Sequence, residues 1–256
     1  MGLVEAAFHE GIAVCTLNRP EKLNALSRAL ERELDAALSR TEVRSAPCLV
    51  VTGAGRAFSA GADVGEMRGS SPADVLAYYR ESGEVYERLA AFPRPTIAAV
   101  HGYCLGGGFE LALACDFRVA DPTAVFGLPE VSIGILPSSG GTLRLVRAVG
   151  PARAKELMLL RRRFGAQEAL ALGLVTEVVE EGRALARALE LARELAALPP
   201  LAVEVARRAV DAVAGAPRDA ALLIERLGYG VLAQTRDARE AADAFLDRRE
   251  PRFEGR

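Results

Sequence analysis

Short apolar runs that end in glycine alternate with segments of helical character in this chain, and this alternation restricts the fold more than any other feature. Residues 46–55 (APCLVVTGAG) and 92–102 (FPRPTIAAVHG) are predicted to form buried strands. A polar helix is predicted over residues 72–91, and a glycine-led helix is predicted from residue 107. A βαβα rhythm is typical of proteins that pack helices against sheets, so we expect an α/β fold.

The rest of the chain fits an α/β core followed by helices. Residues 3–20 predict a hairpin that turns at Glu10-Gly11, and a leucine every four residues predicts an amphipathic helix, at Leu26, Leu30, Leu34 and Leu38. Further elements are predicted as strands at 117–120, 124–127 and 174–179, and as helices at 142–149, 151–160 and 166–172. From residue 183 the pattern is almost wholly helical, with a break at Pro199-Pro200. We expect a core over residues 1–195 and a helical region over residues 196–256.

Composition and charge narrow the class of protein. The 256-residue chain is half apolar and has a formal charge of −2, so it can bury a large core and has no general attraction for nucleic acid or an anionic membrane. Its four cysteines form no CxxC pair and are expected to be buried free thiols, at Cys15, Cys48, Cys104 and Cys115. Two distant histidines argue against a metal site. Without a signal peptide pattern or an apolar run of about 20 residues, we expect a soluble cytoplasmic protein with no nucleic-acid or membrane partner.

Three consecutive glycines, residues 106–108, precede the predicted helix that contains Glu110. Without Cβ atoms, such a stretch lets a ligand reach the free N–H groups at a helix start, where a negative charge is stabilised. It also lets a helix pack closely against a strand, and the residues alone leave both interpretations open. A second loop of small residues, 51–63, follows the first predicted buried strand and offers the N–H of Ala62. Two N–H donors that meet at one oxygen stabilise an enolate-like charge.

Glu110 and Glu130 are lone acids in apolar surroundings. Glu110 falls in the first turn of its predicted helix, where the helix dipole and free amides favour the ionised carboxylate. Two carboxyl groups held in one apolar pocket rarely ionise together, so one tends to stay protonated while the other is charged. Such a pair provides an acid and a base at the same pH, although the sequence alone does not show that the two residues meet.

Several motifs, in order, resemble the enoyl-CoA hydratase/isomerase, or crotonase, superfamily almost from end to end. They are LNRPEKLNALS (17–27), GRAFSAGADVGEM (55–67), PTIAAVHGYCLGGGFELALACDFRVA (95–120), FGLPEVSIGILPSSGGTLRL (126–145), ALALGLVTEVV (169–179) and AFLDRREPRF (244–253). The resemblance implies a spiral core of repeated ββα units and a C-terminal helical region used for trimerisation, often with two trimers stacked as a hexamer. It also implies an acyl thioester of coenzyme A as the ligand, with no separate cofactor.

The resemblance implies roles for the residues already singled out. It implies that the N–H groups of Ala62 and Gly107 form an oxyanion hole for the thioester carbonyl. Glu110 is then the base that acts on water and Glu130 the proton donor to Cα, so that a 2-enoyl-CoA is hydrated to a 3-hydroxyacyl-CoA. Contacts to the CoA and acyl parts, within a pocket wall that includes residues 66–90, are expected at Lys22, Leu23, Ser59, Ala60, Gly61, Asp63, Val64, Phe109 and Leu136.

Other activities stay open within this resemblance. Family members that only shift a double bond commonly keep the acid at the place of Glu130 and lose the one at Glu110, so the presence of both favours hydration. Isomerases and dehydratases of specialised acyl-CoA substrates share most of the frame. Three consecutive arginines, residues 161–163, suggest another hypothesis, a non-catalytic relative that binds RNA. A solvated or salt-bridged surface is the favoured interpretation of this cluster. Gly65 and Glu250 stand where relatives often carry basic residues, which weakens the electrostatic part of the expected CoA binding.

Overall fold

A repeat of two strands and a helix builds both sheets of the protein. In the computed structural model, which describes residues 2–67 and 71–256, the first strands of successive repeats pair in parallel within a six-stranded sheet of order β1-β2-β3-β5-β7-β10. These strands are β3 (Leu49–Gly53), β5 (Thr96–Val100) and β7 (Phe117–Ala120). The second strands pair in parallel within a four-stranded sheet of order β4-β6-β8-β9. They are β4 (Ala57–Ser59), β6 (Tyr103–Leu105) and β8 (Val125–Gly127).

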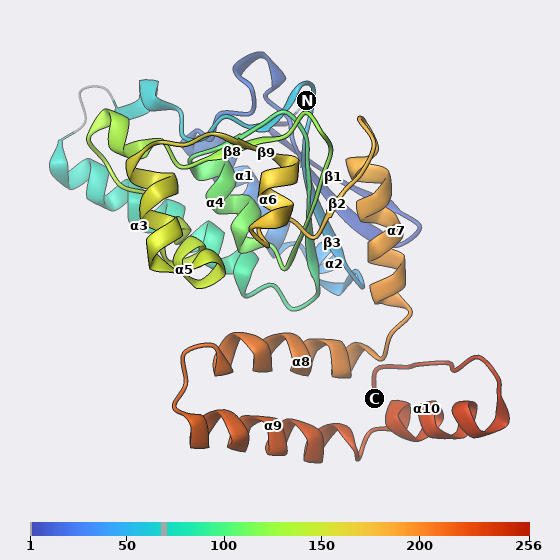
Figure 1. Ribbon diagram of the computed structural model, residues 1–256. Helices are drawn as coiled ribbons and strands as arrows, with labels where there is room; N and C mark the ends of the chain where they lie inside the picture. The colour runs from blue at the N-terminus through green and yellow to red at the C-terminus, as the bar shows by residue number, and fades with distance from the viewer. Residues whose placement is uncertain (1, 68–70) are drawn as a thin grey trace.

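One helix follows each of these strand pairs, namely α3 (Pro72–Ala90), α4 (Gly107–Ala114) and α5 (Gly141–Leu159). Each repeat therefore adds one strand to each sheet and one helix, which winds the chain into a spiral of ββα units (Figure 1). The expected α/β fold is confirmed. Within α5 the backbone breaks at Gly150, with φ 75° and ψ 163°, which explains why the sequence predicts two helices there.

Strands outside the repeats complete the two sheets. β1 (Val4–His9) and β2 (Ile12–Leu17) form the predicted antiparallel hairpin, and both turn residues, Glu10 and Gly11, take positive φ. At the other edge β10 (Glu177–Val178) is shorter than the predicted strand. β9 (Phe164–Gly165) pairs antiparallel with β8 and leads into α6 (Ala166–Ala171). Short helices that were not predicted are η1 (Pro20–Lys22), α2 (Thr41–Ser45), η2 (Val64–Met67) and η3 (Glu130–Ile133).

α1 (Arg28–Ser39) turns its apolar stripe toward the core, where Leu30, Leu34 and Leu38 are buried. Leu26, the first of the four predicted leucines, lies ahead of the helix and forms a single parallel β-bridge with Ala62. This bridge holds the loop after β4 against the start of α1. The position of Ala62 therefore depends on a contact between two segments that are far apart in the sequence.

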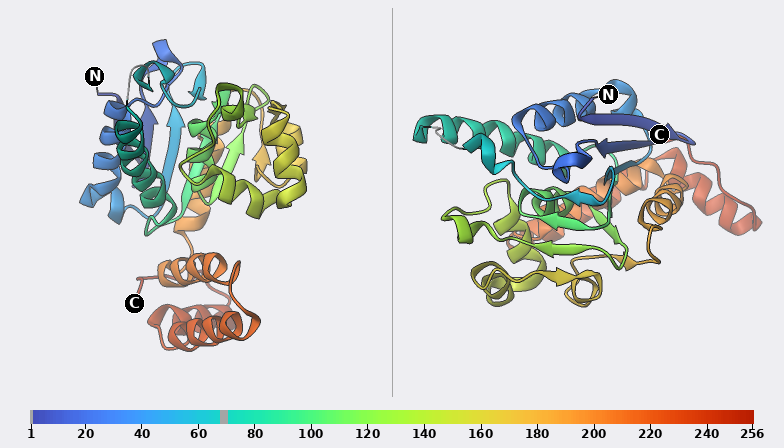
Figure 2. Two further views of the ribbon diagram at one scale, coloured as in Figure 1. Left: turned by 90° about the vertical axis from the view of Figure 1, so that its left-hand side faces the viewer. Right: turned by 90° about the horizontal axis from the view of Figure 1, so that it is seen from above.

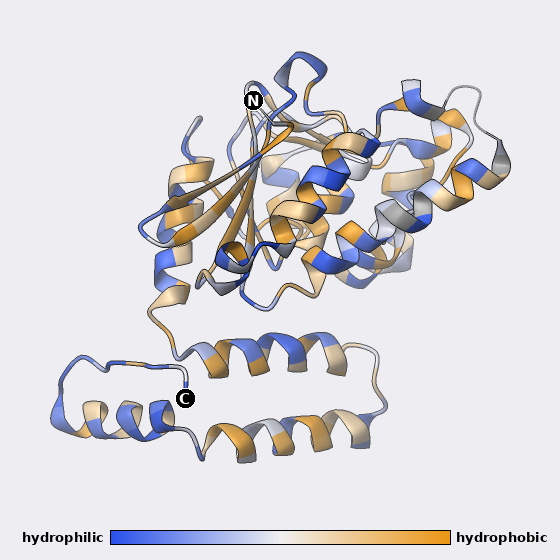
Figure 3. Ribbon diagram, turned by 180° about the vertical axis from the view of Figure 1, so that it is seen from behind, coloured by the Kyte–Doolittle hydropathy of each residue, from blue (hydrophilic) through white to orange (hydrophobic). Residues whose placement is uncertain are grey.

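The strands β2, β3 and β5 of the six-stranded sheet are buried on both faces. Successive residues of β2 point to opposite sides, so that Ala13 and Cys15 join one apolar cluster while Ile12 and Val14 join the other. Helix α7 (Ala184–Ala196) covers the second face with small side chains, at Ala184, Ala188 and Ala192. The strands of this sheet carry mostly apolar residues along their length (Figure 3). All four cysteines are buried free thiols, as predicted.

The last three helices lie together, apart from the two sheets (Figures 1 and 2). They are α8 (Pro200–Val213), α9 (Arg218–Leu232) and α10 (Arg236–Asp247). Helices α8 and α9 run antiparallel, side by side, and neither contains a buried residue. Within the described ranges, no helix combines the length and apolar character needed to cross a membrane.

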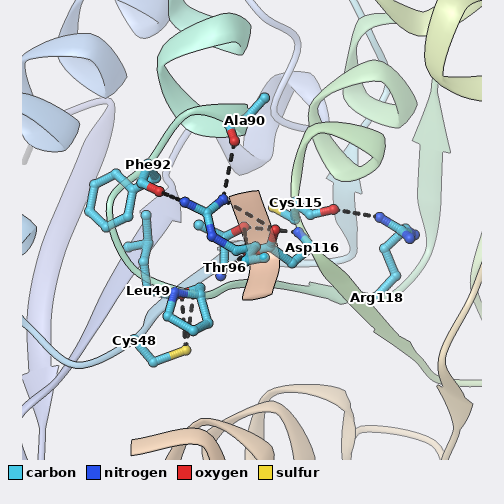
Figure 4. Close-up of polar contacts among 10 residues, drawn as sticks. Cys48, Leu49, Ala90, Phe92, Thr96, Cys115, Asp116 and Arg118 are labelled. Atoms are coloured by element: carbon cyan, nitrogen blue, oxygen red, sulfur yellow. Dashed lines mark hydrogen bonds and ion pairs between the residues drawn. The ribbon is translucent and has the colours of Figure 1, made fainter. Parts of the chain in front are cut away.

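An arginine of α8 joins this helical region to the core, at Ala90, Phe92 and Asp116, which Figure 4 labels. The Arg207 guanidinium donates hydrogen bonds to the carbonyl oxygens of Ala90 and Phe92, at the end of α3, and pairs with Asp116 Oδ1 at 3.3 Å. Asp116 Oδ2 accepts hydrogen bonds from the N–H and the hydroxyl of Thr96 at 2.7 and 2.9 Å. Because the Arg207 and Asp116 side chains are only 11% and 16% exposed, water screens this ion pair little.

Replacing Arg207 with methionine is expected to lower the free energy of unfolding by about 3–5 kcal/mol, because Asp116 then stays buried without its counter-charge. Chemical denaturation followed by circular dichroism measures the loss. Arg208→Met is the matched control, since the Arg208 side chain is 63% exposed and its pair with Glu204 lies on the helix surface. We expect this control to change the stability by less than about 1 kcal/mol. Equal losses in the two variants would contradict the importance of the buried pair.

Candidate active site

A cavity of about 210 Å³ lies beside the N-terminus of α4. Its wall consists of the loop after β4, the first residues of α4, residues of the segment 129–139, and side chains of α1 and α3. The two predicted catalytic acids and the two predicted oxyanion residues all belong to this wall. A larger hollow of about 670 Å³ along α10 is lined by charged residues and contains none of them. The fold therefore gathers the predicted catalytic residues at a single place.

The N–H groups of Ala62 and Gly107 are both available to a ligand in this cavity. Gly107 is the first residue of α4, so its N–H has no acceptor within the helix. The bridge between Leu26 and Ala62 uses the carbonyl of Gly61 and the N–H of Asp63, which leaves the N–H of Ala62 unused. In the described part of the chain neither N–H has a hydrogen-bond acceptor. A Cβ added to Gly107 would lie 3.6 Å from the Ala62 nitrogen, so the two donors border the same small space.

Glycine is needed at residues 106, 107 and 108 for different structural reasons. A Cβ on Gly106, whose φ is 51°, would lie 2.9 Å from Glu130 Oε1, and one on Gly107 would lie 3.0 Å from the hydroxyl oxygen of Tyr86. These two glycines keep the cavity open. A Cβ on Gly108 would lie 2.6 Å from the carbonyl oxygen of Ser59, so this glycine lets α4 pack against β4. Both interpretations that the sequence left open therefore apply, but to different glycines.

The start of α5 holds Glu110 in place. Its Oε1 accepts hydrogen bonds from the N–H groups of Ser139 and Gly141, both at 2.8 Å, and the residue is only 3% exposed. Burial raises the pKa of Glu110, while the two N–H donors and the nearby Arg144 guanidinium favour its ionised form. A Cβ on Gly141 would lie 2.5 Å from Glu110 Cγ, so this close approach requires glycine at that position. The carboxylate consequently has a fixed position in the cavity wall.

Glu130 begins η3 and is half-buried in the same wall. Among residues 2–67 and 71–256, none forms a hydrogen bond with its buried Oε2. Burial, with a smaller contribution from the charge of Glu110, raises the pKa of Glu130 to about 7. Near neutral pH this carboxyl group therefore gains and loses a proton readily, which is the property that a proton donor needs.

Four of the residues expected to contact the ligand line the cavity, namely Ala60, Gly61, Val64 and Leu136. Val64 and Leu136 are 55% and 59% exposed, so the cavity opens to solvent near them. Of the predicted pocket wall over residues 66–90, three side chains of α3 face the cavity, whereas residues 68–70 lie outside the described residues.

Other expected contact residues support the loop after β4 and are not part of the cavity wall. The hydroxyl of Ser59 is fully buried and accepts a hydrogen bond from Gly61 N–H at 3.2 Å. The carbonyl of Leu23 accepts one from Ala60 N–H at 2.9 Å, while the neighbouring Lys22 is exposed. Asp63 pairs with Arg19 at 2.7 Å, and this arginine holds the pKa of Asp63 below its usual value. No group of three or more His, Cys, Asp or Glu among the described residues is placed to hold a metal ion.

The sequence predicts Phe109 as a contact to the acyl group, and the structure places it in the core, outside the cavity wall. Phe109 is 1% exposed and does not belong to the cavity wall. Its ring packs in the core against Phe126 and Phe164, with centroid distances of 5.4 and 5.9 Å. Neighbouring side chains on an α-helix point about 100° apart, and in α4 it is Glu110 that points toward the cavity. Phe109 therefore anchors a different side of α4 in the core.

Four polar residues that the sequence did not single out also line the cavity, namely Glu31 from α1 and, within the predicted wall over residues 66–90, Tyr78, Ser82 and Tyr86 from α3. The three hydroxyl residues of α3 recur every four positions, so they share one face of the helix. This spacing of polar residues within a predicted helix was the available signal. For Glu31 the signal in the sequence was weaker: it is an acid next to Leu30, which belongs to the predicted apolar stripe.

Known proteins match both the sequence and the fold. The sequence profile of the enoyl-CoA hydratase/isomerase family matches residues 7–256. The chain is 43% identical over 249 residues to 2,3-dehydroadipyl-CoA hydratase of Escherichia coli K12, a match that covers 96% of each protein. It is 39% identical over 240 residues to short-chain-enoyl-CoA hydratase of Clostridium acetobutylicum, covering 93% of this chain and 92% of that protein. The crystal structure of an enoyl-CoA hydratase from Bacillus anthracis superposes with a TM-score of 0.94 at 36% identity, covering 99% of this chain and 100% of that one. The chain therefore belongs to the enoyl-CoA hydratase/isomerase family.

Proposed function

We propose that this protein is an enoyl-CoA hydratase, which adds water across the 2,3 double bond of a 2-enoyl-CoA to give a 3-hydroxyacyl-CoA. One observation carries the proposal. Two N–H groups that donate no hydrogen bond to any described residue line one cavity together with the carboxyl groups of Glu110 and Glu130. The N–H groups suit a carbonyl oxygen that becomes negatively charged, and the acids suit proton transfer to and from water. The names of the two relatives, both hydratases of enoyl-CoA esters, support the same class of reaction.

In the proposed reaction the thioester oxygen lies between the N–H groups of Ala62 and Gly107. Glu110 takes a proton from a water molecule while the water oxygen bonds to C3, and the electron pair of the double bond moves through C2 to the thioester oxygen. The two N–H groups and the positive end of the α4 dipole stabilise this enolate. Glu130 then gives a proton to C2. One proton passed from Glu110 to Glu130 through solvent restores the site.

The CoA part of the substrate is proposed to leave the cavity past the loop after β4. Ala60 and Val64 border the cavity on this side. Lys22 is exposed and directly precedes Leu23, whose carbonyl holds Ala60, so its ammonium group is proposed to meet a phosphate of CoA as a point charge. Water is the only other reactant, and the proposed reaction needs no separate cofactor.

Isomerisation of a double bond is the second candidate, because Glu130 by itself has the pKa of about 7 that suits moving a proton between two carbons. Dehydration of a 3-hydroxyacyl-CoA is the reverse of the proposed reaction and uses the same groups. RNA binding is less well supported. Within the arginine cluster of residues 161–163, Arg162 forms ion pairs with Glu156 and Glu168 at 2.9 and 3.7 Å, which favours a salt-bridged surface.

Loss of the absorbance of the conjugated enoyl thioester, after the protein is mixed with crotonyl-CoA, tests the proposed function. We expect this loss, with 3-hydroxybutyryl-CoA as the product. A 3-enoyl-CoA supplied in a parallel reaction separates the two candidates. Its conversion to the 2-enoyl ester, together with no hydration of crotonyl-CoA, would replace the hydratase by an isomerase.

The rate of hydration is expected to fall as the pH rises past about 7, because Glu130 must carry a proton to donate it and burial raises its pKa to about 7. The pH profile of kcat/KM for crotonyl-CoA reports this ionisation in the free enzyme. The raised pKa of Glu130 also affects the free energy of unfolding. Between pH 4.5 and about 7, Glu130 keeps a proton in the folded protein that it has lost in the unfolded chain. Its contribution to stability therefore declines as the pH rises through this window. A kcat/KM that stays level across neutral pH would contradict the donor role.

We propose that the C-terminal helices provide the contacts of a homotrimer, or of a hexamer made of two trimers. In support, these helices expose large apolar side chains, at Val210, Leu223, Leu227, Tyr229, Val231, Phe245 and Leu246, each more than half exposed. Such surfaces usually mark interaction sites. Sedimentation equilibrium is expected to give the mass of three or six chains, and Leu227→Glu is expected to lower it. A monomer at micromolar concentration would contradict the proposal.

A further inference from the structure

A third carboxyl group, that of Glu31, lies in the wall of the same cavity and has no part in the proposed addition of water. Glu31 is 4% exposed. Its Oε1 accepts hydrogen bonds from the hydroxyl groups of Ser82 at 2.8 Å and Tyr86 at 3.3 Å, and Tyr78 contributes a further side-chain hydrogen bond. Burial raises the pKa of Glu31, while the three hydroxyl donors favour its charged form. We call these four residues the polar wall.

The polar wall borders the proposed oxyanion hole within the same cavity. The Tyr86 hydroxyl oxygen would be 3.0 Å from a Cβ on Gly107, so it is next to the proposed oxyanion hole, and Glu31 lies one hydrogen bond further on. Glu31, Tyr78 and Ser82 also border a second hollow of about 190 Å³, so they separate it from the cavity. The Arg28 guanidinium covers the Tyr78 ring at 4.7 Å. Since CoA is proposed to leave past the loop after β4, we infer that the other end of the substrate points at this wall.

The chemistry of the polar wall suits one kind of acyl group. Ser82 and Tyr86 already donate their hydroxyl hydrogens to Glu31, so the wall offers acceptor oxygens to a ligand. An alkyl end that reaches the wall removes water from these oxygens and returns no hydrogen bond. A terminal carboxylate meets the like charge of Glu31, which is buried. A hydroxyl group, by contrast, donates a hydrogen bond to the wall.

We propose that the preferred substrate is an enoyl-CoA whose acyl chain carries a hydroxyl group near its distal end, and that the carboxylate of Glu31 accepts the hydrogen bond from it. This inference rests on the proposed hydratase activity and narrows its substrate class. Glu31 is then a specificity-determining residue. Ser82 and Tyr86 act through it as positioning residues, because their two hydrogen bonds orient the carboxylate.

Substrates matched in their number of non-hydrogen atoms test the proposal. The value of kcat/KM is measured for 5-hydroxypent-2-enoyl-CoA against hex-2-enoyl-CoA, and for 6-hydroxyhex-2-enoyl-CoA against hept-2-enoyl-CoA. We expect the hydroxylated substrate to be preferred by about 10-fold or more in at least one pair, as is usual for a hydrogen bond to a charged acceptor. 2,3-Dehydroadipyl-CoA, which ends in a carboxylate, is expected to be a poorer substrate than 6-hydroxyhex-2-enoyl-CoA.

Two variants of Glu31 separate recognition from a structural role. Glu31→Leu replaces the acceptor with an apolar group and is expected to reverse the preference within the pairs. Glu31→Gln keeps the size of the side chain but removes its charge, and is expected to raise kcat/KM for 2,3-dehydroadipyl-CoA about 10-fold relative to 6-hydroxyhex-2-enoyl-CoA. Each comparison is a ratio of two substrates in one preparation, so a partly unfolded variant gives the same ratio as a fully folded one. Glu42→Gln, an exposed acid paired with Arg40, is the control and leaves the ratios unchanged.

Equal kcat/KM values within both pairs for the unmodified protein would overturn the inference, and so would a preference that survives Glu31→Leu. The hydration of crotonyl-CoA shows whether only the inference about Glu31 fails or whether the proposed hydratase function fails as well. Hydration of crotonyl-CoA without any preference in the matched pairs overturns only the role of Glu31. No hydration of any of these substrates overturns the hydratase proposal and the substrate class together.

Discussion

Glu110→Gln is expected to lower kcat for the hydration of crotonyl-CoA by about 10²–10⁴-fold, the usual contribution of a general base. The substituted amide has nearly the same size, and its carbonyl oxygen can still accept the hydrogen bonds from Ser139 N–H and Gly141 N–H. The position is therefore preserved while the ability to take a proton from water is lost. Glu130→Gln is expected to cause a loss in the same range, because the amide cannot donate a carboxylic proton to C2.

The double variant and a control sharpen this result. Both acids act on one addition step, so the double substitution is expected to be little slower than the slower single one. Glu87→Gln is the control, since its side chain is 68% exposed and its partner Arg144 also lies near Glu110. It is expected to keep its activity. Near-normal hydration by either single variant would contradict the two-acid mechanism. Activity on a 3-enoyl-CoA that survives Glu110→Gln would favour isomerisation.

Gly107→Ala is the second substitution with a large expected effect, a loss of about 10²–10³-fold in kcat/KM, the size seen when an oxyanion donor is lost. The added Cβ would lie 3.6 Å from the Ala62 nitrogen and 3.0 Å from the Tyr86 hydroxyl oxygen, in the space that the thioester oxygen is proposed to occupy. Gly107 does not have a positive φ, so its backbone accepts alanine. Steady-state kinetics with crotonyl-CoA measures the loss.

A second glycine provides the control for this experiment. Gly165 directly precedes α6, has a φ of −84°, and has no atom within 4 Å of an added Cβ. Gly165→Ala is therefore expected to keep full activity. Thermal unfolding of both variants shows whether the fold is intact. We expect Gly107→Ala to stay folded, because alanine is a better helix former than glycine. Normal kcat/KM in Gly107→Ala would show that the thioester oxygen lies elsewhere.

Local patterns were sufficient for most of the secondary structure. The hairpin turn at Glu10-Gly11 needs positive φ at both positions, and the sequence marks it with glycine between two β-prone runs. The buried strands β3 and β5 are short apolar runs between turn residues. These features depend on neighbouring residues only, so they can be predicted without the fold. The short elements α2 and η3 have too few residues to show a period, and they were not predicted.

Residues that act across the fold were harder to assign. Phe109 and Glu110 are adjacent in an apolar helix, and the sequence does not show which of them points to the core. Packing against Phe126 and Phe164 decides the orientation of Phe109. Glu31 was missed for the same reason, because its hydrogen-bond partners lie on another helix, more than fifty residues away in the sequence.

The sequence by itself determined the α/β class, the family, and the candidacy of Ala62, Gly107, Glu110 and Glu130, whereas the ββα repeats were only implied by the resemblance. It could do so because strands, turns and helix starts follow from local spacing, and because the motifs stand in the order that the family requires. Only the tertiary structure decided that these four residues border one cavity, that Phe109 is turned away from it, and that Glu31 closes it with a polar wall. Burial and the meeting of distant segments set these features, and both arise only when the repeats are wound together.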